Sequence, residues 1–510
     1  MMRDIREVLI EHKVATVLIA AFTINVLACL LPANFDSAYW ATVVRNIRSG
    51  FGLYAVDGYF YTPVWGYMLG ATDAIASIMI NVGNYLTVVP QAIGIRFDPF
   101  CFTSESTAPI FNIVNRSILI AGNFILAYLV HTTVIELGYS NDAAFKAMAL
   151  TLFCPILIVG SCIIGMPDVY SAVFILGTIL MMLRKQFFFA GVFFAISVLT
   201  KFFPVFLIFI VLAYIMAVYR DDIRTCAKQI ALSVSGALVT TIVIYIPIIM
   251  EGMFWESFRF ISDRSTSVEG FITSHLFMIV GAIVAAVAII GLLIHVRRKN
   301  EVHYFNCRNL VLLGVLFAVA ILGLTCAMKG IDGVLSSSRV AFYVFSVIIG
   351  FVMGIALYRN RDGDFNKRFI MMCFLMMTVC MLYPPTPQYL VIIVPFMVMV
   401  IGMGNRMCRK GYVLISIAVI VFVMICNGPL LLSLAEWTDL ISVDTVMAVH
   451  NLFNVSIGGI TLRHLLYLGV GIFQYIGILV LLWYGQVENN TEGFSDVVKE
   501  IDNDRAFFVK

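Results

Sequence analysis

Long runs of apolar residues alternate with short polar segments along almost the whole chain. A run of roughly 20 apolar residues can cross a bilayer as a helix, and many of these runs approach or reach that length. The pattern therefore predicts an all-α, polytopic membrane helix bundle with about 14 transmembrane helices. The predicted spans are residues 14–31, 117–138, 146–165, 168–183, 188–200, 202–219, 228–250, 273–296, 309–328, 338–358, 368–384, 388–404, 411–431 and 463–484.

The first of these runs follows a basic, amphipathic N-terminus. It is longer than the apolar core of a typical signal peptide and contains no A-x-A-like cleavage site, so we expect it to be retained as the first helix. Residues 1–484 then form one polytopic domain. The polar tail, residues 485–510, is expected to be a short, disordered segment in the cytoplasm.

Lysine and arginine concentrate in every second short loop from residue 168 onward. Because short basic loops mark the cytoplasmic side, these loops and both termini are predicted to lie inside a multi-pass protein of the plasma membrane. None of these loops is large enough for a soluble catalytic domain, so any chemistry is expected on the extracytoplasmic face. The basic loops are residues 184–185, 220–228, 297–308, 359–368 and 406–410.

The apolar segment 62–90 conflicts with this alternation of inner and outer loops. A single crossing there would invert the downstream chain and place the basic loops outside. The segment therefore either crosses twice with the residues that follow it or lies as a re-entrant or interfacial element. In both cases residues 32–116 form an outer region that carries interfacial helices.

Composition agrees with a membrane protein and removes several other classes. The chain is 61% hydrophobic and 12% charged, and its mean hydropathy is +0.98, unlike a soluble domain. Its net charge of +3 is spread among the loops and gives no reason to expect nucleic acid. The eleven cysteines contain no CxxC pair. Without nucleotide-binding, metalloprotease or DxD motifs, no cofactor and no metal are expected.

The most informative polar segment follows the first apolar run and begins NFDSAYW. It contains Asp36, Tyr39, Arg45 and Arg48 within a stretch rich in tyrosine and tryptophan. Charge near hydrocarbon is costly and is usually functional, so the segment indicates an active site at the water–membrane boundary. Asp36 could be a general base that takes a proton from an acceptor hydroxyl. Alternatively, it caps a helix N-terminus.

Four further segments are predicted on the same face: Tyr61-Thr62-Pro63, Gly165-Met166-Pro167-Asp168, Thr200-Lys201-Phe202-Phe203-Pro204 and the stretch from Tyr383 to Tyr389. Lys201 could hold a lipid phosphate or snorkel to the interface. Asp168 could orient a sugar hydroxyl, pair with Lys201 or cap a helix. Gln388 and Tyr389 could hydrogen-bond to a sugar and stack on it.

Additional cations are available for a phosphate site on the outer face. They are Arg259, Arg264 and His275, in or beside the loop 251–272, and Arg339 after a run of serines. Asn115 and Asn454 each begin a sequence that matches a glycosylation sequon.

Taken in order, these motifs resemble the GT-C superfamily of integral-membrane glycosyltransferases, most closely the family 87 polyprenol-phosphate-mannose-dependent α-mannosyltransferases. The resemblance covers residues 30–205 and 383–395. It is carried by Asp36-Ser-Ala-Tyr39, Gly50-Phe-Gly-Leu53-Tyr54, Tyr61-Thr-Pro63, Gly165-Met-Pro-Asp168, Ala190-Gly191, Lys201-Phe-Phe-Pro204 and Gln388-Tyr389-Leu390. Met166-Pro167 departs from the usual Gln-x, and Thr62 replaces a common proline.

The resemblance implies an inverting transfer of a sugar, mannose by analogy, from a polyprenyl-phosphate donor to a lipid-linked or glycan acceptor in the cell envelope, with Asp36 as the base. The alternative is a transporter or flippase of a lipid-linked saccharide. A transporter is expected to carry facing charges in mid-helix, whereas the charges here gather near the outer boundary. A structural membrane protein gives no reason for Asp36, Asp168 and Lys201 to share a face.

Overall fold

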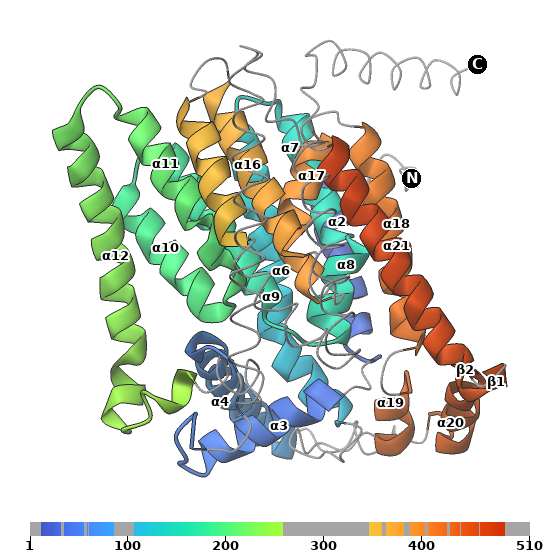
Figure 1. The fold of residues 1–510 in the computed structure, drawn as a ribbon. Coiled ribbons are helices and arrows are strands. Elements are labelled where there is room, and N and C mark those ends of the chain that lie inside the picture. Colours follow the sequence, from blue (N-terminus) through green and yellow to red (C-terminus); the bar gives the residue numbers. More distant parts are fainter. Residues whose placement is uncertain are drawn as a thin grey trace, which may run out of the picture.

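The structure is a computed structural model (Figure 1). It describes residues 12–31, 35–55, 59, 61–85, 107–258, 346–359, 364–381, 388–402, 406–425, 429–438, 440–457 and 460–484. Across this part of the chain the fold is helical, apart from one antiparallel pairing of the two-residue strands β1 (Ser456–Ile457) and β2 (Ile460–Thr461). The prediction of an all-α fold is confirmed for these residues.

Most of the helices run side by side in one bundle (Figure 1). They are α2 (Lys13–Ala28), α6 (Pro109–Glu136), α7 (Asn141–Leu152), α8 (Pro155–Ile158), α9 (Asp168–Leu183), α10 (Phe187–Thr200), α11 (Ile208–Val218), α12 (Ile223–Met250), Ser346–Arg359, α16 (Phe365–Cys380), α17 (Val394–Gly402), α18 (Arg406–Ile425) and α21 (Leu462–Tyr484). Short 3-10 segments are η2 (Phe203–Leu207), η3 (Glu256–Phe258), η6 (Tyr389–Ile393) and η7 (Leu452–Asn454).

Three of the described helices are long and apolar enough to cross a membrane: Asn112–Glu136, Ile223–Met250 and Cys408–Ile425. A fourth candidate is the pair Asn141–Leu152 and Pro155–Ile163, which bends by 41°. Shorter apolar helices coincide with most other predicted spans, and α9 has the predicted bounds. The predicted spans 273–296 and 309–328 lie outside the described residues. The number of crossings stays a prediction.

The bend in that pair follows from its sequence. Pro155 has no backbone N–H to continue α7 and takes the first position of α8, where none is needed. The π-helix η1 (Val159–Ile163) then ends at the turn before α9. This irregular segment allows the backbone to reach the turn at Gly165.

Two pairs of helices approach closely at glycines. A Cβ at Gly191 of α10 would overlap the Ser233 carbonyl oxygen of α12, and a Cβ at Gly236 would overlap the Phe188 carbonyl oxygen. In α18 and α21, a Cβ at Gly411 would lie 2.9 Å from the Gly477 carbonyl oxygen. Small residues at such crossings let helix backbones pack directly, as is common among membrane helices.

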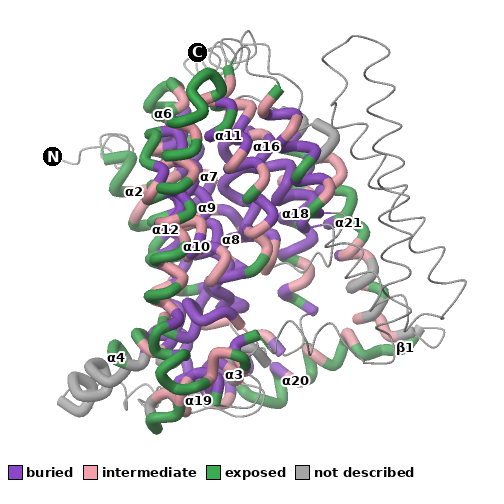
Figure 2. Tube along the Cα trace, turned by 60° about the vertical axis from the view of Figure 1, so that its left-hand side comes forward, coloured by how far each residue is buried: buried purple, intermediate pink, exposed green. Residues whose placement is uncertain are grey.

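The outer surface of α12 is apolar and uncovered along much of the helix (Figure 2). Its exposed side chains include Leu238, Val239, Ile242, Val243 and Ile246. A helix that is apolar all round and largely uncovered is typical of contact with lipid. This surface, together with the apolar length of the helix, supports a membrane location.

One end of the bundle holds α3 (Phe35–Arg48), α4 (Pro63–Tyr85), α19 (Leu432–Trp437) and α20 (Val443–Asn451) (Figures 1 and 2). Residues 63–85 of the segment with uncertain crossing therefore form one helix, α4, beside α3. Residues 86–90 lie outside the described residues.

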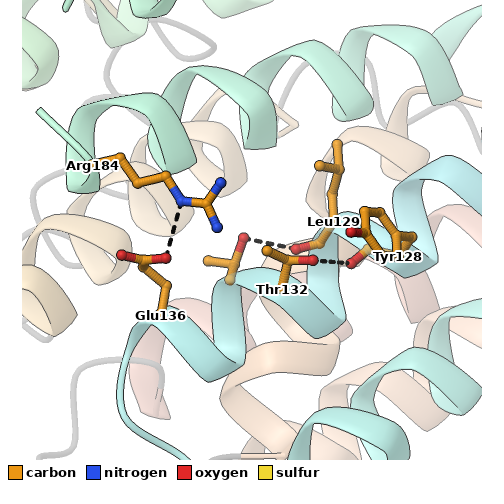
Figure 3. Close-up of polar contacts among 6 residues, drawn as sticks. Tyr128, Leu129, Thr132, Glu136 and Arg184 are labelled. Atoms are coloured by element: carbon orange, nitrogen blue, oxygen red, sulfur yellow. Dashed lines mark hydrogen bonds and ion pairs between the residues drawn. The ribbon is translucent and has the colours of Figure 1, made fainter. Parts of the chain in front are cut away.

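Ion pairs mark the opposite end of the bundle. Arg184, after the last residue of α9, lies 3.0 Å from the Glu136 carboxylate at the end of α6 (Figure 3). Lys13 lies 3.5 Å from Asp142 at the start of α7. These contacts place the start of α2, the 137–140 turn and the first predicted basic loop at one end.

Candidate functional site

A buried ion pair lies where α9 begins and α10 ends. The Nζ of Lys201 is 3.4 Å from Oδ2 of Asp168, and the two side chains are 9% and 0% exposed. Lys201 has an extended backbone (φ −152°, ψ 137°) between α10 and η2, because Pro204 cannot continue a helical hydrogen-bond pattern. The break in the helix therefore turns the lysine toward Asp168, the first residue of α9.

Two tyrosine rings enclose the ammonium of Lys201. Its Nζ lies 5.1 Å from the centre of the Tyr61 ring and 4.4 Å from that of Tyr389. Both distances are within the range of cation–π attraction. Tyr389, the first residue of η6, also packs on Phe203, with ring centres 5.4 Å apart. Four sequence-predicted residues from separate segments thus meet: Tyr61, Asp168, Lys201 and Tyr389.

The charge of Lys201 is maintained by its neighbours. Burial alone lowers the pKa of the ammonium, whereas the Asp168 carboxylate raises it, followed by Tyr389 and Tyr61. The net effect raises the pKa above its ordinary value. Lys201 therefore stays protonated at neutral pH, and the snorkelling interpretation is wrong for this buried, paired side chain.

The turn that carries Asp168 is held from α6. Gly165 has φ +79°, a conformation that glycine adopts without strain. The guanidinium of Arg116 packs against this glycine, so that a Cβ there would lie 3.0 Å from Nη2. Arg116 is fully buried and donates from Nη2 to the Ile163 carbonyl at 3.1 Å and from Nη1 to Asn112 Oδ1 at 2.8 Å.

The same hydrogen-bonded group reaches a distant part of the chain. Asn112 donates to the Ser433 hydroxyl of α19 at 2.9 Å, and Ser433 donates to the Thr107 carbonyl. Arg116 was not among the predicted site residues. A signal for it was present, because Arg116 directly precedes the predicted span 117–138, and an arginine next to hydrocarbon is costly unless it has a role.

Tyr61 belongs to an aromatic group formed by residues of the predicted outer region 32–116. Its ring centre lies 5.0 Å from that of Trp40 in α3, and Trp40 lies 5.5 Å from Trp65 in α4. The hydroxyl of Tyr54 donates to the Tyr61 carbonyl at 2.9 Å. The hydroxyl of Tyr59 donates to the Thr62 carbonyl at 3.1 Å. These contacts fix the entry into α4 and the position of Tyr61 over Lys201.

Asp36 lies in the first turn of α3, four residues before Trp40. The helix begins at Phe35, so the sequence position of Asp36 is inside the helix and not at its N-cap. The structure does not describe the side chain of Asp36. Tyr39 is half-buried and packs on Trp40 with ring centres 5.0 Å apart, whereas Arg45 is exposed on α3.

The remaining predicted residues divide into two groups. Gln388 is half-exposed immediately before η6, where its carbonyl accepts from the Val391 N–H at 3.3 Å. The predicted cations Arg259, Arg264, His275 and Arg339 lie outside the described residues, so their place relative to Lys201 stays a prediction.

The two sequons have opposite surroundings. Asn115 is 2% exposed within α6, so it is inaccessible to a glycosylating enzyme in the folded protein. Asn454, in η7, is exposed. Asn115 lies next to Arg116 in the buried part of α6. The sequon match alone did not indicate that this asparagine is buried.

No cluster of three or more metal-ligating side chains occurs within the described ranges. The chemistry of the assembled site is that of an ion pair within aromatic walls, which suits a polar organic ligand. No model of a known protein family matches the sequence, and no curated protein matches it either.

Proposed function

We propose that this protein is a membrane glycosyltransferase that moves a sugar, mannose by analogy, from a polyprenyl-phosphate donor to a lipid-linked or glycan acceptor. The observation that carries the proposal is the meeting of Tyr61, Asp168, Lys201 and Tyr389 at one buried point. These residues come from motifs whose order and type suggested this chemistry. A purely structural role gives no reason for an ion pair and two tyrosine rings to share that place.

Lys201 has the properties required to contact the donor phosphate. A lysine ammonium has three N–H donors, and the contact with Asp168 at 3.4 Å occupies one of them. Asp168 and the two rings hold the ammonium in a fixed position, so that little side-chain freedom is lost when a phosphate binds. The predicted cations of the 251–272 loop and Arg339 would add positive charge at the same face.

Asp36 is the proposed base. In α3 its position is one helical turn from Trp40, and Trp40 contacts Tyr61, which lies over Lys201. Positions four residues apart share one side of a helix, and this relation between positions 36 and 40 supports the proposal.

The reaction is a single displacement at the anomeric carbon. The acceptor oxygen forms a bond to that carbon as the bond to the phosphate oxygen breaks, and Asp36 receives the acceptor proton. The polyprenyl phosphate leaves with the bonding electron pair. A phosphate leaving group needs no separate acid, so one carboxylate suffices.

The proposed setting is the extracytoplasmic face of the plasma membrane. The bundle end with α3, α4, α19 and α20 is the outer end in this proposal, and the end with the Arg184–Glu136 pair is cytoplasmic (Figures 1 and 3). The full count of about 14 crossings belongs to this proposal, with α4 as an interfacial helix.

The test is transfer by the purified protein in lipid nanodiscs. Polyprenyl phosphates carrying radiolabelled mannose, glucose, galactose or arabinose are incubated with a mixture of lipid-linked and glycan acceptors. The proposal expects one donor to give a labelled, covalently extended acceptor and free polyprenyl phosphate. If reconstituted vesicles instead move an intact lipid-linked saccharide between leaflets without forming a bond, the flippase alternative holds.

A further inference from the structure

The end of α20 and the segment that follows it carry apolar side chains on the surface. Val449 in α20, Leu452 in η7 and Val455 directly after η7 are each more than half exposed. They recur at every third position, a spacing that keeps them on one side of a helical segment. Single apolar side chains on a surface are ordinary, whereas an apolar patch usually marks a contact with a partner or a membrane. We call these three residues the apolar strip.

The other sides of the same segment are polar or packed. Asn451 and Asn454 lie between the residues of the strip, and Asn454 Nδ2 donates to Asn451 Oδ1 at 3.1 Å. Val446, earlier in α20, is buried in a small cluster with Leu432 and Ala435 of α19. The segment is therefore amphipathic, with one side on α19 and the apolar strip facing away from the protein.

The strip lies beside the beginning of α21. The N–H of Leu462, the first residue of α21, donates to the Val455 carbonyl at 2.9 Å. The guanidinium of Arg463 lies 2.7 Å from Nε2 of His450 and donates to the His450 carbonyl at 3.3 Å. These contacts join both ends of the segment from His450 to Val455 to the first turn of α21. The strip therefore has a fixed position relative to that helix.

This end of α21 lies level with the end of a helix that can cross a membrane. Phe453 of η7 packs on a cluster that includes Ile425 of α18 and Val470 of α21. Ile425 is the last residue of α18, and the 18 residues Cys408–Ile425 are long and apolar enough to span a bilayer. They extend about 27 Å, close to the ~30 Å thickness of the hydrocarbon core. Residues that pack at the end of α18 therefore lie near the boundary between hydrocarbon and headgroups.

The outer surface of α21 continues the apolar strip. Its exposed side chains include Leu465, Ile472, Phe473 and Ile476. Figure 1 shows α20, β1 and β2 next to the end of α21, at the margin of the bundle and not over its centre. The strip therefore extends an apolar surface at the place where the headgroups of a bilayer would meet the protein.

The composition of the segment permits contact with lipid. From Val446 to Ile457 the sequence contains no Asp, Glu, Lys or Arg, so no carboxylate, ammonium or guanidinium has to leave water. Because the segment is joined directly to α21, its insertion is an intramolecular step, for which a small apolar area is sufficient. A separate soluble partner would have no such advantage.

We propose that the apolar strip is a membrane-surface anchor that inserts among the upper acyl chains of the leaflet at this end of the bundle. The end of α20 and η7 lie along the membrane surface, as amphipathic interfacial helices do, with Asn451 and Asn454 on the side of the headgroups. Asp444, in the first turn of α20, precedes the strip and stays in water. Such an anchor requires only that the bundle spans a membrane, and it is independent of any transferase activity.

The test measures contact between the strip and lipid acyl chains. An environment-sensitive fluorescent amino acid replaces Val449 in the full-length protein, which is reconstituted singly in phosphatidylcholine nanodiscs with or without bromine atoms near the top of the acyl chains. The matched control carries the same fluorophore at Asp444. A reference carries it at Ile242, on the exposed apolar surface of α12. Bromine should quench the emission from position 449 about as strongly as that from position 242, and should leave position 444 nearly unchanged.

A charge in the strip provides a second arm with its own control. Leu452→Glu, with the fluorophore at position 449, should abolish the quenching because a carboxylate resists transfer from water into the membrane. The neighbouring Asn451→Glu carries the same charge on the polar side and keeps an acceptor for Asn454, so quenching should persist. Both side chains are exposed, so both variants should melt near the wild-type temperature.

Absence of quenching at position 449 would overturn the proposal. Emission typical of water would then mean that the strip is solvated, and emission typical of an apolar place would mean that another segment of the chain or a second copy covers it. Equal quenching at positions 444 and 449 would contradict the one-sided contact. Quenching that survives Leu452→Glu would contradict the role of the strip in holding the segment to the membrane.

Discussion

The ammonium of Lys201 lies 3.4 Å from the carboxylate of Asp168, although 33 residues separate them in the sequence. Sequence reasoning left open whether Asp168 caps a helix, orients a sugar or pairs with Lys201. The structure contains the ion pair, and a contact of Asp168 with a sugar stays a prediction. The pair forms because two irregular backbone segments, the turn at Gly165 and the break before Pro204, bring the ends of α9 and α10 together.

Lys201→Ala should weaken use of the donor mainly through its apparent affinity. A hydrogen bond to a charged group contributes about 1.5–3 kcal/mol, so the KM for the donor should rise roughly ten- to a hundredfold. Steady-state kinetics over a range of donor concentrations would measure the effect. An unchanged donor KM would show that Lys201 has no contact with the phosphate.

The pH dependence of that affinity follows from the raised pKa of Lys201. A lysine whose pKa is raised in the folded state stays charged at any pH below the ordinary lysine pKa of about 10.4. It loses the charge only at higher pH. Deprotonation of Lys201 should therefore not lower donor affinity between about pH 6 and about pH 9.

Since Lys201→Ala leaves Asp168 buried and unpaired, the double variant Lys201→Met with Asp168→Asn serves as the better-folded comparison.

Arg116→Met should loosen the turn that presents Asp168, because it removes the contacts with the Ile163 carbonyl and Gly165. The readout is acylation of Lys201, followed by mass spectrometry, which requires no enzyme activity. Labelling of Lys201 should rise several-fold. Gly165→Ala, which strains the same turn through φ +79°, should act in the same direction.

Arg184→Met provides the control, since it removes an arginine from the partly exposed pair with Glu136 (Figure 3). Labelling of Lys201 should match the wild type in that protein. Normal protection of Lys201 in folded Arg116→Met and Gly165→Ala proteins would mean that the turn does not depend on Arg116.

Gly191→Ala should destabilise the protein strongly, because its Cβ would overlap the Ser233 backbone of α12. Overpacking of a close contact typically costs about 1–3 kcal/mol, and rigid backbone atoms can yield less than side chains. Gly469→Ala in α21 is the control, since nothing lies within 4 Å of its Cβ position. Thermal unfolding in detergent should separate the two, and equal melting temperatures would contradict the observed crossing of α10 and α12.

The predicted orientation can be tested with single cysteines at positions on the two ends of the bundle. Arg45 in α3 and Thr445 in α20 belong to the proposed outer end, and Thr225 at the start of α12 belongs to the opposite end (Figure 1). In a cysteine-free background, a membrane-impermeant thiol reagent should label positions 45 and 445 in intact cells and position 225 only after lysis. Labelling of 45 and 225 from the same side would contradict the bundle's two-ended arrangement.

The helical fold was largely predictable because it depends on apolar length, which a single sequence displays directly. The bounds of α9 and the break at Lys201 followed from hydropathy, because a lysine interrupts the apolar run there. Arg116 could not be assigned in the same way. Its role depends on its contacts with Ile163 and Gly165 in the turn before α9, and the sequence alone does not show which residues of α6 meet that turn.

The close contact of Tyr61 with Lys201 also depends on tertiary structure. Sequence order placed the two residues on one predicted face, but their distance is determined by how Trp40 and Trp65 pack α3 against α4. The predicted cations at 259, 264, 275 and 339 lie outside the described residues, and their role in binding a phosphate remains a prediction.

The turnover number of purified Asp36→Asn tests the central claim most directly. Asparagine preserves size and most hydrogen bonding but cannot accept the acceptor proton, so turnover should fall roughly 10²–10⁴-fold, the usual contribution of general-base catalysis. Donor binding and melting temperature should stay near the wild-type values. Near-normal turnover in this variant would contradict the account, because it would remove Asp36 from the mechanism and leave the proposed transferase without a base.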